Sequence, residues 1–439
     1  MKHPKTGKRA FSLLLAAALL AALSVPAYPA GDIKGAKSYT ITNPYQTVDW
    51  DTWGAYKANL HTHSTASDGR ADFNEMIEAH YAAGYDILGM TDHGVVNRGW
   101  NIQPQPVPLV SFMSYLNPPH PLTDERLAEI TAGVGRGGRG MTDVPFGIEL
   151  NALSMKLTHV NGFFADYGQN ILGRENDFET PIAGVDALGG VTFINHPGYW
   201  LGSRNHPENA GNPKTIAFFT DLFRKYPSCL GIEAVVEEDG ATLYDRVFWD
   251  CLLRSTIPYG RNVWGFADGD THAVKDIGVA FEMFMMPENT VQNVRTAMEN
   301  GTFFACSRNA RLELGADFKA QGDCPLVTRV TVDETRDQIS LEGQDYTEIQ
   351  WIADGKVIAT GATIDLNAYE DDIGCYVRAQ LLGPGGICWT QAFVTDDGTL
   401  APPAEPEVDW FTQRLNDLLF DLMSTRLFVL FELIFRQVA

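Results

Sequence analysis

The feature that most constrains the fold is a regular alternation between residues 55 and 308. Short apolar runs alternate there with stretches of helical periodicity, an order typical of parallel β-strands joined by crossover helices. The strands are predicted at residues 56–60, 87–90, 145–150, 159–164, 191–194, 231–236 and 262–266. Seven such strands favour an α/β fold in which a barrel closes, and an open doubly wound sheet is the alternative.

A helix is predicted over residues 72–83, between the first two strands. One face of this helix carries Phe73, Met76, Ile77, His80 and Tyr81. Gly84 follows at the position where a left-handed residue ends a helix. This spacing predicts that His80 packs on the buried face.

The first residues are typical of an export signal. Four basic side chains precede residues 11–25, which are almost wholly apolar, and small residues follow at Val25-Pro26-Ala27. This pattern predicts a secretory signal peptide over residues 1–27 and a lead-in segment over 28–56. The apolar run is shorter than the ~20 residues that a spanning helix needs, although an uncleaved anchor is the alternative. We therefore expect a secreted or extracytoplasmic protein, with attachment to the cell surface as a further option.

The six cysteines show no Cys-x-x-Cys spacing, which argues against a thiolate zinc site. Export makes disulfides chemically accessible, but their pairing stays open.

After the expected barrel at residues 57–310, the sequence pattern changes to short β-strands separated by turns. Residues 311–396 predict a small β-sandwich, with Asp354-Gly355 as a hairpin turn. Trp351 and Trp389 belong either to its core or to an exposed aromatic binding face. A Pro-rich linker is predicted over residues 397–409. An amphipathic helix is predicted over residues 410–439. This helix lies on a membrane surface, pairs with another copy of the chain or docks on its own barrel.

Charge narrows the range of partners. The chain has 33 Lys and Arg against 55 Asp and Glu, a formal net charge of -22. Nucleic-acid polymers are disfavoured as partners, because cationic side chains supply most of the affinity for phosphate backbones. Small anionic substrates remain compatible where metal ions reverse the local charge.

Histidines and carboxylates recur in short motifs at the predicted strand ends. Such clusters at the strand-end face of a barrel are typical of metal-dependent active sites, whereas a single histidine is more often a structural core residue. Alternate residues leaving a strand point the same way, so His61 with His63, and Asp270 with His272, can each bind one metal jointly. The motifs are His61-Thr62-His63 with Asp68, Thr91-Asp92-His93, Glu149 followed by His159, Asn195-His196-Pro197, and Asp270-Thr271-His272.

The ordered series HTHS, SDG, TDHG, GIE, NHP and DTH resembles the PHP family of metal-dependent phosphoesterases, over residues 57–308. The resemblance implies a distorted seven-stranded β/α barrel with two or three metal ions, followed by the appended sandwich of secreted members. It implies one metal on His61, His63, Glu149 and Asp270. It implies a second on Glu149, His159 and His196, with Glu149 bridging, and a third on Asp68, His93 and His272. Asp268-Gly269 departs from the usual small pair before the last motif, which puts that loop in doubt.

The chemistry that such a cluster supports is hydrolysis. Two close metals can bridge a water, lower its pKa and stabilise an in-line displacement on phosphorus. Imidazole and carboxylate ligands suit zinc, manganese or iron. We therefore expect an exported phosphoesterase that acts on a small phosphorylated or other ester substrate. A carboxylic-ester or amide hydrolase on the same cluster and a non-enzymatic surface-binding protein are the alternatives.

Catalytic roles are predicted for Glu149 and Asp270, and for His206 as an acid that protonates the leaving group. Arg98 and Arg204 lie on predicted strand-end loops and are candidates for binding phosphate oxygens, with ordinary loop charges as the alternative.

Overall fold

The computed structural model describes residues 37–106, 117–152, 154, 156–168, 176–237 and 239–402. The predicted signal peptide at 1–27 and the amphipathic helix at 410–439 lie outside the described residues, as do most of the linker and part of the lead-in segment. Within the described residues, no helix is long and apolar enough to cross a membrane.

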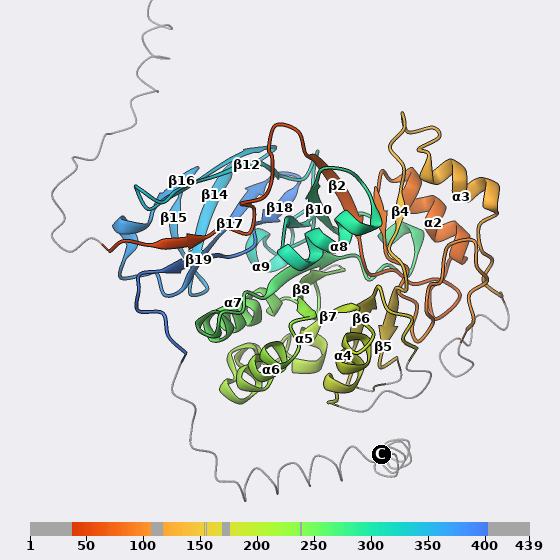
Figure 1. The fold of residues 1–439 in the computed structure, drawn as a ribbon, viewed down its shortest axis with the longest axis horizontal. Coiled ribbons are helices and arrows are strands. Elements are labelled where there is room, and N and C mark those ends of the chain that lie inside the picture. Colours follow the sequence, from red (N-terminus) through yellow and green to blue (C-terminus); the bar gives the residue numbers. More distant parts are fainter. Residues whose placement is uncertain are drawn as a thin grey trace, which may run out of the picture. The chain divides into compact units, whose positions relative to one another are not determined.

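The larger sheet contains eleven strands and joins the N-terminal half of the chain to its C-terminal half (Figure 1). Its main path runs β1-β19-β17-β18-β11-β10-β2-β3-β4, and β14 and β15 extend from β17. The strands on the path are β1 (Thr40–Thr42), β2 (Gly54–Asn59), β3 (Ile87–Leu88), β4 (Thr142–Asp143), β10 (Ala280–Met286), β11 (Phe303–Ser307), β17 (Tyr376–Gly383), β18 (Gly386–Trp389) and β19 (Phe393–Asp396). Strands β2, β3 and β4 are parallel, whereas β10 is antiparallel to β2.

The second sheet contains five strands in sequence order, β5 (Ile148–Leu150), β6 (Val160–Phe163), β7 (Val191–Ile194), β8 (Cys229–Val236) and β9 (Trp264–Asp268). Only β7, β8 and β9 are parallel to one another, and β6 is antiparallel to both neighbours. The expectation of all-parallel strands is therefore wrong at β6. Strands β5 and β6 are antiparallel because the connection between them is short. A parallel pair needs a crossover of a dozen residues or more.

The structure is a mixed α/β fold, and the described strands do not form one closed barrel. The seven predicted strand regions divide between the two sheets, with β2 and β3 in one and β5 to β9 in the other. Two isolated parallel bridges connect the sheets, Thr62 with Thr271 and His93 with Glu149; all these residues except Glu149, which lies in β5, follow a strand end. Both bridges involve residues of the predicted metal motifs.

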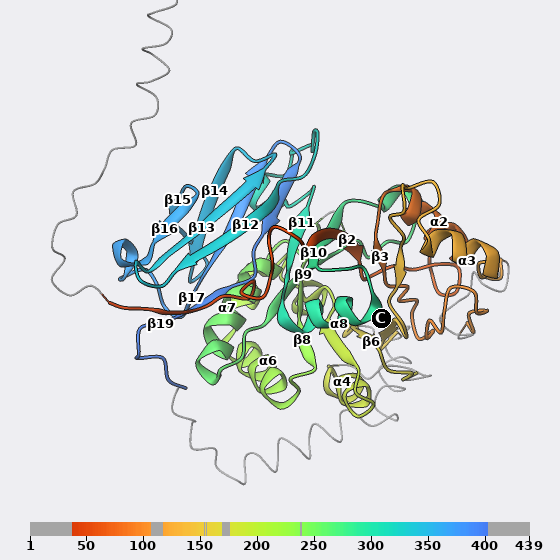
Figure 2. The ribbon, with the colours of Figure 1, turned by 45° about the horizontal axis from the view of Figure 1, so that its top comes forward.

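The helices cover the strands that carry these motifs. Helices α4 (Glu179–Asp186), α5 (Pro197–Leu201), α6 (Pro213–Lys225) and α7 (Asp245–Thr256) lie beside β6 to β8 (Figures 1 and 2). Helices α2 (Phe73–Ala82) and α3 (Asp124–Thr131) follow β2 and β3, and α8 (Val291–Asn300) packs on β10. The short helices are η2 (Pro207–Gly211), η3 (Ile257–Tyr259), η4 (Val274–Asp276), α9 (Arg311–Leu314) and η5 (Leu366–Tyr369).

Helix α2 matches its predicted span closely. Asp72 and Glu75 form a capping box at its start, and Gly84 has a φ of +83° just beyond its end. The five predicted side chains are buried, His80 among them. His80 donates from Nδ1 to the Met76 carbonyl oxygen over 2.8 Å and accepts at Nε2 from Nδ2 of Asn59 over 3.0 Å. This helix therefore packs directly against the strand that leads into the first metal motif.

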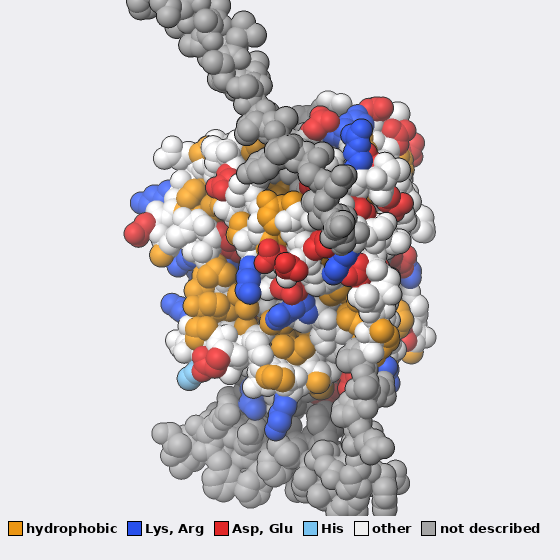
Figure 3. Space-filling model, turned by 90° about the vertical axis from the view of Figure 1, so that its left-hand side faces the viewer, with side chains coloured by type: hydrophobic (Ala, Val, Ile, Leu, Met, Phe, Trp, Pro, Cys, Tyr) orange, Lys and Arg blue, Asp and Glu red, His pale blue; other side chains and the backbone are white. Residues whose placement is uncertain are grey.

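The predicted all-β segment contains a three-stranded sheet of β12 (Leu326–Asp333), β13 (Gln338–Gln344) and β16 (Thr363–Asp365). The hairpin of β14 (Glu348–Ala353) and β15 (Lys356–Thr360) turns at Asp354-Gly355 as expected, because both residues have positive φ. Trp351 and Trp389 are 0% and 1% exposed, so they belong to the core. In Figure 3, acidic, basic and apolar side chains are interspersed on one face of the molecule.

Candidate metal centre

All nine predicted metal ligands come from strand ends that meet at one edge of the two sheets. His61 and His63 follow β2, His93 follows β3, Glu149 lies in β5, and His196 follows β7. His159 immediately precedes β6, and because β6 runs antiparallel, its start lies at the same edge as the ends of its neighbours. Asp68 lies on the loop after β2, and Asp270 and His272 follow β9.

Glu149 is the hub of this cluster, and its side chain is 1% exposed. Five imidazoles surround its carboxylate. The distances to the two carboxylate oxygens are 2.7 Å from Nδ1 of His93, 2.9 Å from Nδ1 of His159, and 3.3 Å from Nε2 of each of His61, His63 and His196. A carboxylate between two sets of nitrogen ligands is arranged to bridge two metal ions.

The carboxylate of Asp270 completes a compact group with the first motif. Its Oδ1 lies 3.3 Å from Nε2 of His61 and 3.1 Å from Nε2 of His63. The two imidazole nitrogens are themselves 3.1 Å apart. Three ligand atoms of this kind, mutually near 3 Å, match the edges of one metal coordination sphere.

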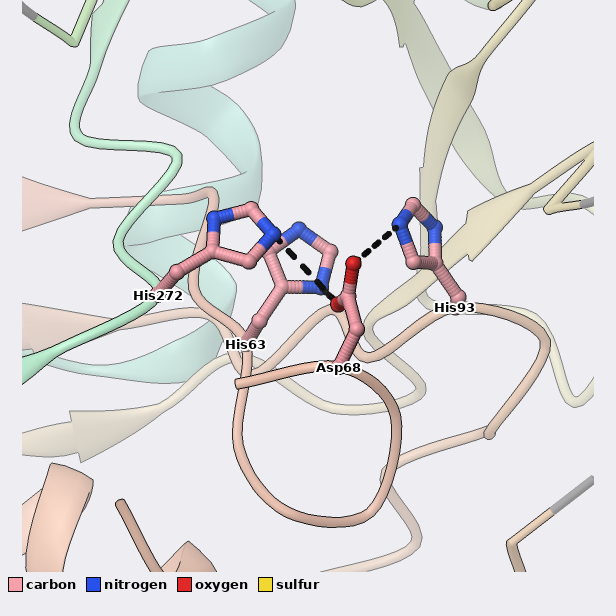
Figure 4. Close-up of side chains that lie close together, drawn as sticks. All are labelled: His63, Asp68, His93 and His272. Carbon is pink, nitrogen blue, oxygen red and sulfur yellow. Dashed lines mark ion pairs between the residues drawn. The ribbon is translucent and has the colours of Figure 1, made fainter. Parts of the chain in front are cut away.

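A further group forms around Asp68, which lies between His272 and His93 (Figure 4). Its carboxylate oxygens lie 3.3 Å from Nε2 of His272, 3.5 Å from Nε2 of His93 and 3.6 Å from Nδ1 of His63. His63 and His93 thus each border two groups. The Asp68 carboxylate is 47% exposed, whereas His63 is buried, so this group opens toward solvent.

The unsatisfied polar atoms of the cluster fit a bound cation. Glu149 Oε2, Asp270 Oδ1 and Nδ1 of His159 are buried without a hydrogen-bond partner, although each has a charged or polar atom within about 3 Å. Buried polar groups are normally satisfied, because leaving one unpaired costs roughly 1–3 kcal/mol. Lone pairs that converge without hydrogens between them suit metal ligation. The residues present therefore fit the divalent ions that the motifs predict.

The electrostatics favour the ligating forms at two of these positions. Burial raises the pKa of Glu149, but the charges of His159, His93 and His61 outweigh it and hold the pKa well below its usual range. Burial, together with the neighbouring His272 and His93, lowers the pKa of His63 to about 4. Glu149 is therefore a carboxylate and His63 a neutral imidazole near pH 7, which are the states that bind metals.

Two ligand residues are held in uncommon backbone conformations. His196 has a φ of +27° and Asp270 a φ of +42°. Positive φ in a residue other than glycine is sparsely populated and persists only where the surroundings enforce it. Each residue lies two positions beyond a buried strand, and there His196 contacts Glu149 while Asp270 contacts His61 and His63.

Surrounding groups hold the ligands in place. Nδ2 of Asn195 donates to Glu149 Oε1 over 2.7 Å, and Asp92 accepts from the backbone N–H of Ser64 over 2.6 Å. Glu233, which the sequence motifs do not include, lies 2.7 Å from Nδ1 of His61 and accepts from the backbone N–H of His196 over 2.6 Å. A buried acid within the apolar strand Cys229–Val236 is the signal that could have identified it.

Asp268 and Gly269, the pair that differs from the PHP pattern, also help to hold the candidate ligands in place. Asp268 accepts from the backbone N–H of Leu60 over 2.5 Å, and the N–H of Gly269 donates to Oδ1 of Asn59 over 3.0 Å. A Cβ at Gly269 would lie 2.2 Å from the hydroxyl oxygen of Thr271. These contacts tie the loop after β9 to the end of β2, and so bring Asp270 to His61.

Two predicted residues are not brought into the cluster. The side chain of His206 is 65% exposed and contacts Glu208 at 3.3 Å, so the structure gives it no place beside the nine ligands. Arg98 is held by Asp166 through hydrogen bonds of 3.0 and 2.7 Å on the surface. Local sequence placed both on strand-end loops, but the loops carry them outward.

Arg204 does border the site. It lines a cleft of about 450 Å³ together with Tyr199, Glu237, Asp270 and Arg311. The hydroxyl of Tyr199 donates to Glu237 over 3.1 Å, and Glu237 lies within ligand distance of Asp270 and His272. The cleft therefore opens directly onto the candidate metal ligands, because Asp270 is part of its wall.

No family model and no curated protein matches the chain. Among solved structures, it is similar to a two-domain protein containing a predicted PHP-like metal-dependent phosphoesterase from Bacteroides vulgatus, with 15% identity, 81% of this chain and 90% of that chain covered, and a TM-score of 0.42. It is also similar to the lesion-specific endonuclease PfuEndoQ from Pyrococcus furiosus, with 12% identity, 56% of each chain covered and a TM-score of 0.33. The chain thus spans just over half the length of the endonuclease. At these identities and scores, the similarity by itself assigns no function.

Proposed function

We propose that this chain is an exported metal-dependent hydrolase that cleaves a phosphate ester of a small molecule. The observation that carries the proposal is the convergence of five imidazoles from four strand ends on the buried carboxylate of Glu149, with Asp68, Asp270 and His272 in adjoining groups. Scattered structural histidines would have no reason to share one carboxylate. Their unsatisfied lone pairs would be costly without a bound cation.

The chain's own residues would hold two or three divalent ions, for which zinc, manganese and iron are the candidates. Close-spaced divalent ions supply a reactive water at neutral pH and offset the charge of a phosphoryl group. Glu149 would bridge two sites, and Asp270 with His61 and His63 would complete one of them. Asn195 fixes the Glu149 carboxylate through its hydrogen bond of 2.7 Å, and so holds the bridging group in one position between the two sites.

The cleft beside the cluster supports a small ester substrate. Among the described residues Arg204 forms no ion pair, so its guanidinium can bind an anionic oxygen in the cleft. Tyr199 presents an aromatic ring that is 38% exposed, in edge contact with His196 at a centroid distance of 5.1 Å. A substrate can therefore place its phosphoryl group at the ligands and its leaving group along Tyr199 and Arg204.

A hydrolase for carboxylic esters or amides is the second candidate. Glu237 and Asp276 line the same cleft as Arg204, and these acids would disfavour a leaving group with a second negative charge. A neutral ester or amide would meet no such repulsion. A surface-binding protein without catalysis is less well supported, because the two tryptophans that would form its aromatic face are buried.

Export and surface association are part of the proposal. The basic and apolar N-terminal residues support secretion, and the amphipathic pattern of residues 410–439 supports contact with a membrane surface or a second copy. Fractionation of cells that express the full chain would locate it. Flotation with anionic liposomes and sedimentation, with and without residues 410–439, would test the association.

The reaction class is tested with three substrates that release the same chromophore, an aryl phosphate, a diaryl phosphate and an aryl acetate. The protein is purified without chelators and its metal content is measured in parallel. We expect hydrolysis of a phosphate ester, bound metal, and loss of activity by several orders of magnitude in Glu149→Ala together with at least one metal ion. His120→Ala is the matched control, because His120 is an exposed histidine that pairs with Asp72 away from the ligands.

Faster hydrolysis of the aryl acetate would select the second candidate. Full metal content and activity in Glu149→Ala would contradict the bridging role. Metal binding without hydrolysis of any ester would favour a binding protein.

A further inference from the structure

Three of the six cysteines meet where β11 pairs with β18. Cys306 and Cys388 are direct partners in this antiparallel ladder. Sγ of Cys324 lies 3.5 Å from the carbonyl oxygen of Ile387 and 3.8 Å from that of Ser307, which are the residues next to those partners. All three side chains are buried, and no disulfide joins any of the six cysteines in this structure.

The hydrogen-bond pattern shows how Cys306 and Cys388 face each other. The N–H of Thr390 donates to the carbonyl of Ala379, so this pair across β17 and β18 is hydrogen-bonded, and by alternation so is the pair of Leu381 and Cys388. The backbone groups of Cys388 therefore point toward β17. Across the other edge of β18, Cys388 meets Cys306 as a non-hydrogen-bonded pair.

Such a pair has the geometry that a disulfide needs. In antiparallel sheets, the Cα atoms of non-hydrogen-bonded partners lie about 4.5 Å apart, and disulfides span Cα separations of about 4.4–6.8 Å. Cys306 also lies in the middle of the three, because its thiol contacts those of both Cys324 and Cys388.

We propose that Cys306 forms a disulfide with Cys388 across the ladder, and that Cys324 is the adjacent thiol into which this disulfide can exchange. The oxidant is a small-molecule disulfide such as oxidised glutathione. One cysteine thiolate attacks it and releases one glutathione thiolate. The second cysteine sulfur then attacks the mixed disulfide and releases the other, so two cysteine thiols lose two electrons and two protons while the oxidant becomes two thiols.

The cross-link would join two parts of the chain that are far apart in sequence. Strand β11 belongs to the ladder β11-β10-β2 that leads to His61, whereas β18 belongs to the β-rich segment. The bond would restrict the unfolded chain and so stabilise the native state. None of the three cysteines contacts the candidate metal ligands, so this proposal stands apart from the proposed hydrolysis.

The test uses the full chain, folded in a glutathione redox buffer and digested under non-reducing conditions for mass spectrometry. We expect a peptide that links Cys306 to Cys388 and four titratable thiols among the six cysteines. Cys229→Ser is the matched control, since Cys229 is equally buried and lies on β8; it should keep the link and lose one thiol. Cys388→Ser should link Cys306 to Cys324, and Cys306→Ser should abolish both links.

Reduction of the oxidised wild type provides a readout that needs no variant, and the variants serve as its controls. Dithiothreitol should lower the midpoint of thermal unfolding of the oxidised wild type and of Cys229→Ser, but not that of Cys306→Ser. Six free thiols in folded protein after oxidation, or a link that omits Cys306, would overturn the proposal.

Discussion

The buried carboxylate of Glu233 lies 2.7 Å from Nδ1 of His61 and, through its second oxygen, accepts a hydrogen bond of 2.6 Å from the backbone N–H of His196. One acid on β8 thereby positions two candidate ligands that follow β2 and β7. With Nδ1 of His61 donating to Glu233, Nε2 is left with its lone pair directed toward Asp270 and Glu149.

Glu233→Gln should therefore weaken metal binding without removing a ligand. The amide keeps the size of the carboxylate but loses its charge, and outer carboxylates of this kind typically contribute 10- to 100-fold in metal affinity. Competition with a fluorescent chelator would measure the change. Unaltered affinity would show that Glu233 has only a structural role.

The meeting of the nine candidate ligands could be expected from sequence, because each motif is local and lies at the end of a predicted strand. His61 and His63 are two residues apart at the end of an apolar run, and this spacing alone directs both side chains to one side. Glu233 could not be recognised in this way, because its partners are a side chain 172 residues away and a backbone N–H that no motif displays. The outward course of the His206 loop depends equally on tertiary packing.

The pairing of the strands could not be predicted from the local sequence pattern either. The apolar run of β10 was not among the predicted strands, yet Glu282 on β10 pairs with Ala58 on β2 and places an antiparallel strand beside the first motif. The reversal at β6 depends on the nature of a connection that carries no helix in its described residues. Periodicity indicates which face of a strand is buried, but it does not identify which distant strand lies beside it.

Asp68→Ala should empty the solvent-side group without dismantling the others. Its carboxylate contacts His272, His93 and His63, but the distances around Glu149 and Asp270 do not involve it. We expect the loss of at most one metal ion and a smaller fall in aryl phosphate hydrolysis than in Glu149→Ala. Asp166→Ala is the matched control, because Asp166 is also 47% exposed and its ion pair is with Arg98, away from the candidate ligands. Equal losses in Asp68→Ala and Glu149→Ala would mean that the groups bind metal as one unit.

His80 should make the stability of the fold depend on pH. Burial lowers the pKa of His80 to about 4, from an ordinary value of 6.5. Between these values the unfolded chain binds a proton that the folded chain does not, so the free energy of unfolding falls as the pH decreases from 6.5 to 4. The contribution is about 3 kcal/mol, present in full above the unfolded pKa.

Urea unfolding of the wild type and of His80→Gln at several pH values would isolate this contribution, since protonation of the metal ligands is common to both proteins. The stability advantage of the wild type should shrink from pH 7.5 to pH 4. A difference that does not change with pH would place the pKa of His80 near its ordinary value.

Arg378 and Asp250 form a buried ion pair that joins β17 to helix α7. The guanidinium donates to the two carboxylate oxygens over 2.8 and 2.7 Å, and the hydroxyl of Tyr376 donates to the same carboxylate over 2.7 Å. Removing one member leaves an uncompensated buried charge, so Arg378→Met should lower the free energy of unfolding by about 3–5 kcal/mol. The double variant with Asp250→Leu should recover part of this loss, because neither charge then remains buried. Denaturant unfolding of the wild type, Arg378→Met and the double variant would measure both effects. If the double variant is less stable than Arg378→Met, Asp250 stabilises the fold through Tyr376 independently of the ion pair.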